Sequence, residues 1–298
     1  MRIFLLFTVF FLFVLQAREY KIGFPQDTLS NDWRKAQVLQ VQEEVKKYPF
    51  LTLDVRDAQG KVSNQIADME YFINNNYDFI ITSPIHAQIS SKVLKKAIDK
   101  NIKVILLSRG IQGDEYTTFI RPDNYKIAYE AGIYLAKKLN YKGTVLMLEG
   151  IKTASTTQKR TQGFMDAIKK YPNIKVITQT ANYLRVDAIT VMEELYLNHT
   201  HFDAIFAHSD SMLSGARTVM KKYGQKLNLP TVGMDYFQEV KEAILNEEQT
   251  ASFVYPTGAK EGIDAIVNII HNKKVAKEIF LPTQLVTKEN AHNVEPIF

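Results

Sequence analysis

Short apolar runs alternate along this chain with longer segments in which apolar residues recur every three or four positions. The short runs are rich in Val, Ile and Phe and are bounded by turn residues, which is typical of buried strands. They predict strands at 20–24, 51–55, 79–82, 104–107, 144–148, 175–180, 204–207, 231–233 and 251–254. The longer segments predict helices at 31–47, 63–75, 87–100, 158–170, 186–197, 212–223 and 237–246.

One strand followed by one helix, repeated in this way, predicts parallel sheets that are covered by helices on both faces. The chain has 298 residues, of which 46% are hydrophobic, with only 13 Gly and 9 Pro, and this composition excludes low-complexity disorder. A chain of this length exceeds what a single core normally uses. We therefore expect an α/β fold with two doubly wound parallel-sheet lobes.

Polar and aromatic residues gather in the loops that follow the predicted strands. In doubly wound sheets, ligands bind beyond the carboxyl ends of the strands, where these loops converge. Ser, Thr, Asp and Asn also cap helices, so capping remains an alternative role for each of them. Trp33 and Arg109 are poor caps and favour a ligand site. The loops concerned are 25–32, 83–86, 108–113, 150–157, 208–211 and 235–236.

The first seventeen residues have the pattern of a secretory signal peptide. Arg2 precedes an apolar run at 3–15, and Gln16 and the small residue Ala17 follow the run. This run is shorter than the ~20 apolar residues that a membrane-spanning helix needs. We expect cleavage after Ala17 and export of a soluble protein to the periplasm. Because the chain has no cysteine, a lipid-modified cysteine cannot anchor it.

The charges of the chain are mixed along its length. The formal net charge is +5, and acidic and basic pairs alternate, as in Glu43-Glu44 and Lys46-Lys47. This arrangement favours a solvated surface over a nucleic-acid or membrane patch. We expect no nucleic-acid partner.

Catalysis is the alternative class of function, and the residues argue against it. The pair His199 and His201 has the spacing of two metal ligands, but it precedes a predicted strand and favours a solvated turn. The triplet at 208–210 contains His, Ser and Asp, yet catalytic triads assemble through folding rather than from neighbours in sequence. Only Gly23 lies near the first strand, so no phosphate-binding loop follows it. We expect no metal site, no cofactor and no enzymatic activity.

Six short segments of the chain are informative through their order and spacing. They are KIGFPQDTLSNDW (21–33), VILLSRG (104–110), RPDN (121–124), the segment 149–164 that ends in RTQGF, IFAHSD (205–210) and VGMD (232–235). On these segments the chain resembles the type I periplasmic binding proteins of the ribose- and galactose-binding group, and the similarity extends from about residue 20 to 286.

The resemblance implies two lobes that close on a ligand and are joined by a three-segment hinge. The crossings are expected near 121–124, 253–256 and 281–283, and the N-terminal lobe is expected to include a helix at 257–272. The resulting division is a signal peptide at 1–17, an N-terminal lobe at 18–122 plus 254–281, and a C-terminal lobe at 123–253 plus 282–298. Sugar-binding repressors share the resemblance but begin with a DNA-reading helix pair, whereas this chain begins with an export signal.

The resemblance also implies a set of ligand-binding residues. Aromatic faces stack on the sugar ring, while charged and amide side chains hydrogen-bond its hydroxyls, because buried hydroxyls without partners are costly. Trp33 and Tyr183 match the stacking aromatics, and Arg109 and Asp235 match the polar anchors. The full expected set is Asn31, Trp33, Arg109, Gln158, Tyr183, Asp210, Asp235 and Phe253.

Several positions depart from the ribose pattern of the family. Ser108 stands where the family has Asp, Gln158 where it has Arg, with Arg160 two residues later, and Phe253 where it has Gln. Arg34 replaces an aromatic residue. Because these changes remove an acid and add a cation, they argue against ribose or glucose itself and leave the ligand open among a modified sugar, a furanose-like signal and a compound with a carboxylate or phosphate.

The expected function is that of a monomeric solute-binding protein that captures a small polar, sugar-like ligand. Members of the family deliver such ligands to the permease of an ABC importer or to the periplasmic domain of a sensor kinase. Both partners recognise the closed form, which the ligand stabilises. The sequence does not distinguish an importer from a sensor kinase as the membrane partner, and we take transport as the first alternative.

Overall fold

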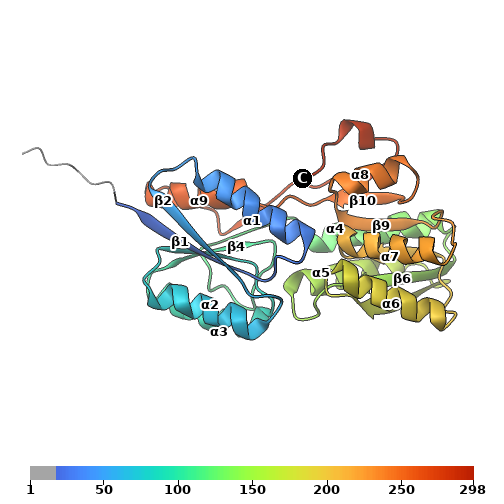
Figure 1. The fold of residues 1–298 in the computed structure, drawn as a ribbon, viewed down its shortest axis with the longest axis horizontal. Coiled ribbons are helices and arrows are strands. Elements are labelled where there is room, and N and C mark those ends of the chain that lie inside the picture. The colour runs from blue at the N-terminus through green and yellow to red at the C-terminus, as the bar shows by residue number, and fades with distance from the viewer. Residues whose placement is uncertain (1–17) are drawn as a thin grey trace, which may run out of the picture.

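The computed structural model describes residues 18–298 as two lobes that lie side by side (Figure 1). The expected signal peptide at 1–17 lies outside the described residues. Among the helices of residues 18–298, none is long and apolar enough to cross a membrane.

Each lobe contains one six-stranded sheet. The strand order is β11-β5-β4-β3-β1-β2 in the first sheet and β12-β10-β9-β8-β6-β7 in the second. All pairs are parallel except that of β10 with β12. The strands are β1 (Tyr20–Gln26), β2 (Leu51–Asp57), β3 (Phe79–Thr82), β4 (Lys103–Leu107), β5 (Thr118–Arg121), β6 (Gly143–Glu149), β7 (Ile174–Thr180), β8 (Ala204–Ala207), β9 (Thr231–Asp235), β10 (Ala251–Val254), β11 (Glu278–Phe280) and β12 (Leu285–Thr287).

Helices cover both faces of each sheet, as Figure 1 shows. We call the first sheet with α1, α2, α3 and α9 the N lobe, and the second sheet with α4 to α8 the C lobe. The helices are α1 (Asp32–Val45), α2 (Val62–Asn74), α3 (Ala87–Asp99), α4 (Asn124–Lys138), α5 (Ser155–Ile168), α6 (Arg185–Leu197), α7 (Asp210–Lys222), α8 (Gln238–Leu245), α9 (Ala259–Ile270) and a 3-10 turn, η1 (Ala291–Asn293). The expected α/β arrangement of two parallel-dominated sheets is confirmed.

The alternation of side chains along each strand supplies two cores per sheet. In β3, Phe79 and Ile81 pack under α1 and α9, whereas Ile80 packs under α2 and α3. In β8, Phe206 packs under α4 and α5, whereas Ile205 packs under α6 and α7. Continuous apolar strands are therefore required, because both faces of each sheet are buried.

The chain passes between the two sheets three times, after β5, after β10 and after β11. As a result, α9 lies on the N lobe beside α1 although it follows most of the C lobe in sequence (Figure 1). The three crossings lie at 122–123, 255–258 and 281–284. The pocket described below lies between the lobes, close to the second crossing.

All the predicted strands are present, with ends within two residues of the prediction, and so are the predicted helices. Two elements of the first half, β5 and α4, were not predicted, and neither were the three-residue strands β11 and β12. The buried face of α4 consists largely of Ala and Gly, which makes its apolar stripe weak. Small residues are needed there because α4 and α5 pack closely: a Cβ added at Gly163 would lie 2.2 Å from the carbonyl oxygen of Tyr125.

Candidate ligand-binding site

A pocket lies where the carboxyl ends of strands from both sheets face each other. Its free volume is about 20 Å³, well below the roughly 300 to 1,000 Å³ typical of small-molecule sites, so the lining side chains nearly fill it. Its wall combines three guanidinium groups, one carboxyl group, three aromatic rings and several hydroxyls. The lining residues are Asn31, Trp33, Arg34, Ser108, Arg109, Thr156, Arg160, Tyr183, Ser209, Asp235 and Tyr255.

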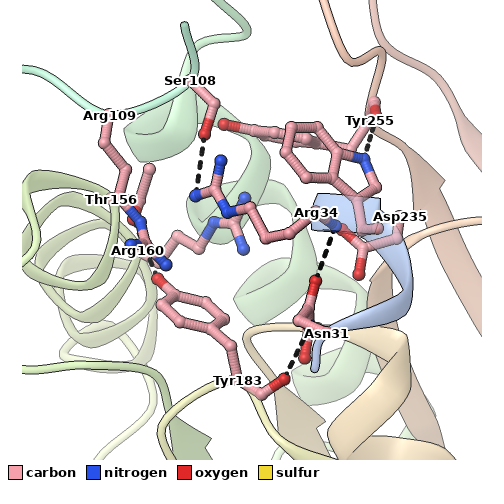
Figure 2. A pocket seen from close by; sticks show the side chains of 11 residues that line it. Asn31, Arg34, Ser108, Arg109, Thr156, Arg160, Tyr183, Asp235 and Tyr255 are labelled. Carbon is pink, nitrogen blue, oxygen red and sulfur yellow. Dashed lines mark hydrogen bonds between the residues drawn. The ribbon is translucent and has the colours of Figure 1, made fainter. Parts of the chain in front are cut away.

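Both lobes contribute to this wall (Figure 2). The N-lobe part comes from the start of α1 and from the loop after β4. The C-lobe part comes from the first turns of α5, from the loops after β7 and β8, from the end of β9 and from the crossing after β10. The pocket therefore has the position that the fold favours for ligands.

Asn31 connects the two halves of the site. Its side-chain oxygen caps α1 by accepting from the Arg34 backbone N–H at 2.9 Å, and its side-chain nitrogen donates to the Tyr183 carbonyl at 2.7 Å. The first contact lies within the N lobe and the second crosses to the C lobe. Asn31 thus serves as a helix cap and as a link between the lobes.

Trp33 and Tyr255 form the apolar corner of the pocket. The Trp33 indole donates to the Tyr255 carbonyl at 2.8 Å, and the two rings meet edge to face with centroids 5.5 Å apart. Only 4% of Trp33 is exposed. The Tyr255 hydroxyl is buried without a hydrogen-bond partner.

Tyr183 presents its ring on the C-lobe side. Its hydroxyl is hydrogen-bonded to Thr156 and Thr157 at 2.9 and 2.8 Å, and the Arg109 guanidinium lies 5.0 Å from the ring centroid. Gly150 lies directly against this ring: a Cβ added there would be 2.0 Å from it. The absence of a side chain at Gly150 is therefore what allows the ring to occupy its position.

We expect Gly150→Ala to weaken ligand binding by about tenfold, because the new methyl group forces the Tyr183 ring out of contact with the ligand. Aromatic contacts of this kind contribute about 0.5 to 1.5 kcal/mol beyond the burial of apolar area. Isothermal titration calorimetry checks the affinity, and thermal unfolding checks the fold. Gly262→Ala in α9 is the matched control, since the nearest atom to its added Cβ would be a side-chain methyl group of Leu107, at 3.2 Å. Unchanged affinity of the Gly150 variant would show that the ring position is not needed.

The Arg34 guanidinium forms an ion pair and several hydrogen bonds with other side chains of the protein. Its Nε lies 3.2 Å from an oxygen of Asp27, and its Nη1 donates to Ser83 at 2.9 Å and to Gln37 at 3.2 Å. Its Nη2 donates to Ser108 at 3.4 Å, as Figure 2 shows. Burial and the neighbouring positive charge of Arg109 lower the pKa of Arg34 to about 10, so that it stays charged at neutral pH.

Arg109 has fewer protein partners. Its Nη1 donates to Asp27 at 2.7 Å, while its Nε is buried without a partner. The side chain is 2% exposed. A guanidinium offers five N–H donors in a planar fork, so Arg109 retains donors for adjacent ligand oxygens.

Arg160 enters the pocket from α5. Its Nε donates to Asn124 at 2.9 Å and its Nη1 to the carbonyl of His208. The guanidinium lies 4.6 Å from the Tyr255 ring centroid. Burial and the Arg160 charge hold the pKa of His208 well below its usual value, so this imidazole is neutral.

Asp235 is the carboxyl group of the wall. It is 5% exposed, and its Oδ2 is buried without a hydrogen-bond partner. Burial, and then the charge of Asp210, raise the pKa of Asp235 well above its usual value, while Arg160 and Arg34 act in the opposite direction. An unpaired acceptor here and unpaired donors on Arg109 match a ligand with hydroxyl groups, because a hydroxyl both donates and accepts.

Strained backbone conformations gather at this site. Ser108, Tyr183, Asp235 and Tyr236 have positive φ angles of 65°, 66°, 130° and 60°. Such conformations cost about 1 to 3 kcal/mol each and persist where surrounding contacts enforce them. At Asp235 and Tyr236 one such contact is visible, since the Tyr236 backbone N–H donates to buried Asp210 at 2.9 Å.

The structure brings five of the eight expected residues into the wall: Asn31, Trp33, Arg109, Tyr183 and Asp235. Gln158 lies outside it, because α5 turns its Thr156 and Arg160 face inward and leaves Gln158 exposed, where it donates to the Lys152 carbonyl.

Asp210 and Phe253 also lie outside the wall. Asp210 is fully buried behind Asp235, where it accepts from Gln249 at 2.7 Å and from Ser252. Phe253 lies within β10 and packs into the C-lobe core. The residue that reaches the pocket from this segment is Tyr255, beyond the end of the strand.

Six lining residues were not in the set expected from the sequence: Arg34, Ser108, Thr156, Arg160, Ser209 and Tyr255. Arg160 had a usable signal, because it follows Thr156 by four residues and therefore lies on the same face of a helix. No sequence signal distinguishes Tyr255, whose position depends on where β10 ends.

Contacts around the pocket rim hold the lobes together. Thr153 donates from its hydroxyl to the Ile85 carbonyl at 2.9 Å and accepts at its own carbonyl from the Ala87 N–H at 3.1 Å. The Gly110 N–H donates to Ser155 at 2.7 Å. These contacts join N-lobe loops to the start of α5, so the structure has a closed arrangement in which the lobes enclose the pocket.

Comparison with known proteins agrees with this geometry. The sequence profile of the periplasmic binding protein domain matches residues 22–274. The chain belongs to the periplasmic binding protein family. The galactofuranose-binding protein of Escherichia coli (strain K12) is 31% identical over 89% of this chain and 84% of its own length. The ribose import binding protein of Bacillus subtilis (strain 168) is 28% identical over 91% of this chain and 88% of its own.

Solved structures give the same result. The fructose-binding periplasmic domain of a hybrid two-component system has a TM-score of 0.86 and 31% identity, with 92% of each chain covered. A galactofuranose-binding protein has a TM-score of 0.87 and 29% identity, covering 92% of this chain and 96% of its own. The four proteins in these comparisons are binding proteins rather than enzymes, in agreement with the expectation from the sequence.

Proposed function

We propose that this protein is a periplasmic receptor that captures one neutral sugar between its lobes and presents it to a membrane partner. The observation that carries the proposal is the set of unsatisfied polar atoms at the pocket: Arg109 Nε, Asp235 Oδ2 and the Tyr255 hydroxyl are buried without partners. Leaving such atoms unpaired costs about 1 to 3 kcal/mol each. A ligand rich in hydroxyls satisfies both the donors and the acceptors.

The charges of the pocket favour a neutral ligand over an anion. The three guanidiniums are accompanied by two buried carboxyl groups, Asp27 and Asp235. Asp27 pairs with both Arg34 and Arg109, and Arg34 has its remaining hydrogen bonds to protein side chains. An anion would therefore compete with an existing buried carboxylate and would face Asp235.

The relatives support a sugar and include furanose binders. Two of the similar proteins are named for binding galactofuranose, and a solved relative with 28% identity and a TM-score of 0.84 is described as bound to arabinofuranose. We propose Trp33 and Tyr183 as the aromatic faces, and Arg109, Arg160, Asn31 and Asp235 as the hydrogen-bonding groups, for a sugar of five or six carbons.

The location in the periplasm rests on the family and on the leader pattern at 1–17. Delivery to an ABC importer is the first candidate for the membrane partner, since the relatives include a ribose import binding protein. A sensor kinase is the second candidate, because the fructose-binding domain of a hybrid two-component system matches 92% of this chain at 31% identity.

The test is a titration of purified residues 18–298 with neutral pentoses, hexoses and polyols and with the corresponding sugar acids. We expect one neutral sugar to bind at a single site. We also expect the fluorescence of Trp33 to change in parallel, because Trp33 is the only tryptophan and lines the pocket. Calorimetry measures the stoichiometry. Binding of acids without neutral sugars, or chemical turnover of the bound compound, would contradict the proposal.

A further inference from the structure

Asp27 is a buried carboxyl group that pairs with two arginines but does not line the pocket. It follows β1 directly and is 1% exposed. Its Oδ2 accepts from Arg109 Nη1 at 2.7 Å, and its Oδ1 lies 3.2 Å from Arg34 Nε. Both arginines line the pocket, so Asp27 acts on the ligand only through them.

Ser108, the residue before Arg109 in sequence, is uncharged and therefore does not act as a counter-charge to the arginines. Ser108 lines the pocket, and its hydroxyl accepts from Arg34 Nη2 at 3.4 Å. The other partners of Arg34, Gln37 and Ser83, are also neutral. Among the described residues that hydrogen-bond or form an ion pair with Arg34 or Arg109, Asp27 is therefore the one carboxylate.

We propose that Asp27 is a positioning residue that sets the charge preference of the pocket. By neutralising Arg34 and Arg109 from behind the wall, it leaves their remaining N–H groups to bind hydroxyls and makes a ligand carboxylate or phosphate unnecessary. This inference rests on the proposed function and assigns the choice of neutral over acidic sugars to a residue that does not touch the ligand.

The physical reason is the cost of buried charge. Removing one partner of a buried ion pair leaves the other partner uncompensated. Without Asp27, two guanidiniums in the N-lobe wall would lack a counter-charge, and an anionic ligand would supply it. A residue with a merely structural role would instead, when replaced, weaken the binding of neutral and acidic ligands equally.

The experiment compares Asp27→Asn with the wild-type protein. The probes are D-ribose, L-arabinose, D-fructose and D-galactose as neutral sugars, and D-gluconate, D-galacturonate and inorganic phosphate as anions. We expect the ratio of anion affinity to neutral-sugar affinity to rise by about tenfold or more, the size of one hydrogen bond to a charged group. Asp57→Asn is the matched control, since Asp57 is an exposed aspartate at the end of the neighbouring strand β2.

A second variant separates the charge from the fold. Asp27→Asn combined with Ser108→Asp returns a carboxylate beside Arg34, to which the Ser108 hydroxyl is hydrogen-bonded at 3.4 Å. Aspartate tolerates the positive φ of 65° at position 108 better than most residues. We expect the double variant to regain the wild-type preference for neutral sugars and, if Asp27→Asn alone unfolds, to regain the fold.

The outcomes for the two proposals are distinct. Failure of every neutral sugar to bind the wild-type protein would overturn the proposed function, while the anion affinities of Asp27→Asn and of the wild-type protein, compared directly, would still test the role of Asp27. An Asp27→Asn variant that gains no relative affinity for anions would overturn the inference. So would a double variant that does not fold, or that folds without regaining the neutral preference.

Discussion

Replacing Arg109 with alanine is expected to weaken sugar binding at least about 100-fold, because it removes two or more hydrogen bonds from a charged donor, each contributing about 1.5 to 3 kcal/mol. The Nε of Arg109 is buried and has no protein partner, so we expect the ligand to accept its hydrogen bond. The same change also deprives Asp27 of its 2.7 Å partner. Calorimetric titration with the sugar that the proposed ligand screen finds to bind measures the loss.

The control for this prediction is Arg56→Ala. Arg56 is also an N-lobe arginine, but it lies outside the pocket wall and stacks on Tyr71, with 3.5 Å between its guanidinium carbon and the ring centroid. Its replacement should leave the affinity unchanged. An Arg109 variant that binds within about twofold of wild type would contradict the site, since a lost charged hydrogen bond exceeds that factor.

Asp235→Asn is expected to stabilise the sugar-free protein and to weaken binding at the same time. At neutral pH we expect the free energy of unfolding to rise by about 1 to 3 kcal/mol, because the neutral amide replaces a carboxyl group whose charged form is disfavoured by burial. The affinity should fall by about tenfold or more, because the ligand loses a charged acceptor. Thermal unfolding and calorimetry measure the two effects.

The pH dependence gives this prediction a second readout. Burial raises the pKa of Asp235 in the folded protein above its value in the unfolded chain. Between these two pKa values the folded state retains a proton that the unfolded state releases, so wild-type stability falls as the pH rises above about 4. The advantage of the Asn variant should therefore be absent below about pH 4 and complete above the folded pKa.

Asp187→Asn is the control, since Asp187 is a C-lobe aspartate near the surface that accepts from Asn182. An Asp235 variant with unchanged stability at neutral pH would show that this carboxyl group is solvated when the sugar is absent. Higher stability together with weaker binding would instead show that the buried Asp235 contributes to ligand binding and destabilises the sugar-free protein.

Much of the architecture could be predicted from local patterns. Strands such as 79–82 and 204–207 are buried on both faces, and their continuous apolar runs are visible without any tertiary information. The same reasoning failed for α4, because its buried face consists largely of Ala and Gly, which contribute little apolar signal. It also failed for β11 and β12, since three residues are too few to show a period.

The candidate site was predictable where a residue lies directly after a strand or at a helix start. Asn31, Trp33, Arg109 and Asp235 are in such positions, and all four line the pocket. Gln158 shows the limit of this reasoning. A shift of two residues along α5 rotates a side chain by more than half a turn, so Arg160 faces the pocket and Gln158 faces solvent.

The sequence by itself determined the strand and helix rhythm, the two lobes and the loops in which the site lies, because these depend on periodicity and on neighbours along the chain. Only the tertiary structure decided which polar groups pair. Asp27 and Arg109 are 82 residues apart, and the carboxylate that serves the arginine comes from a different strand end than Ser108. Such pairing depends on how strands lie side by side in the sheet, and no local pattern specifies it.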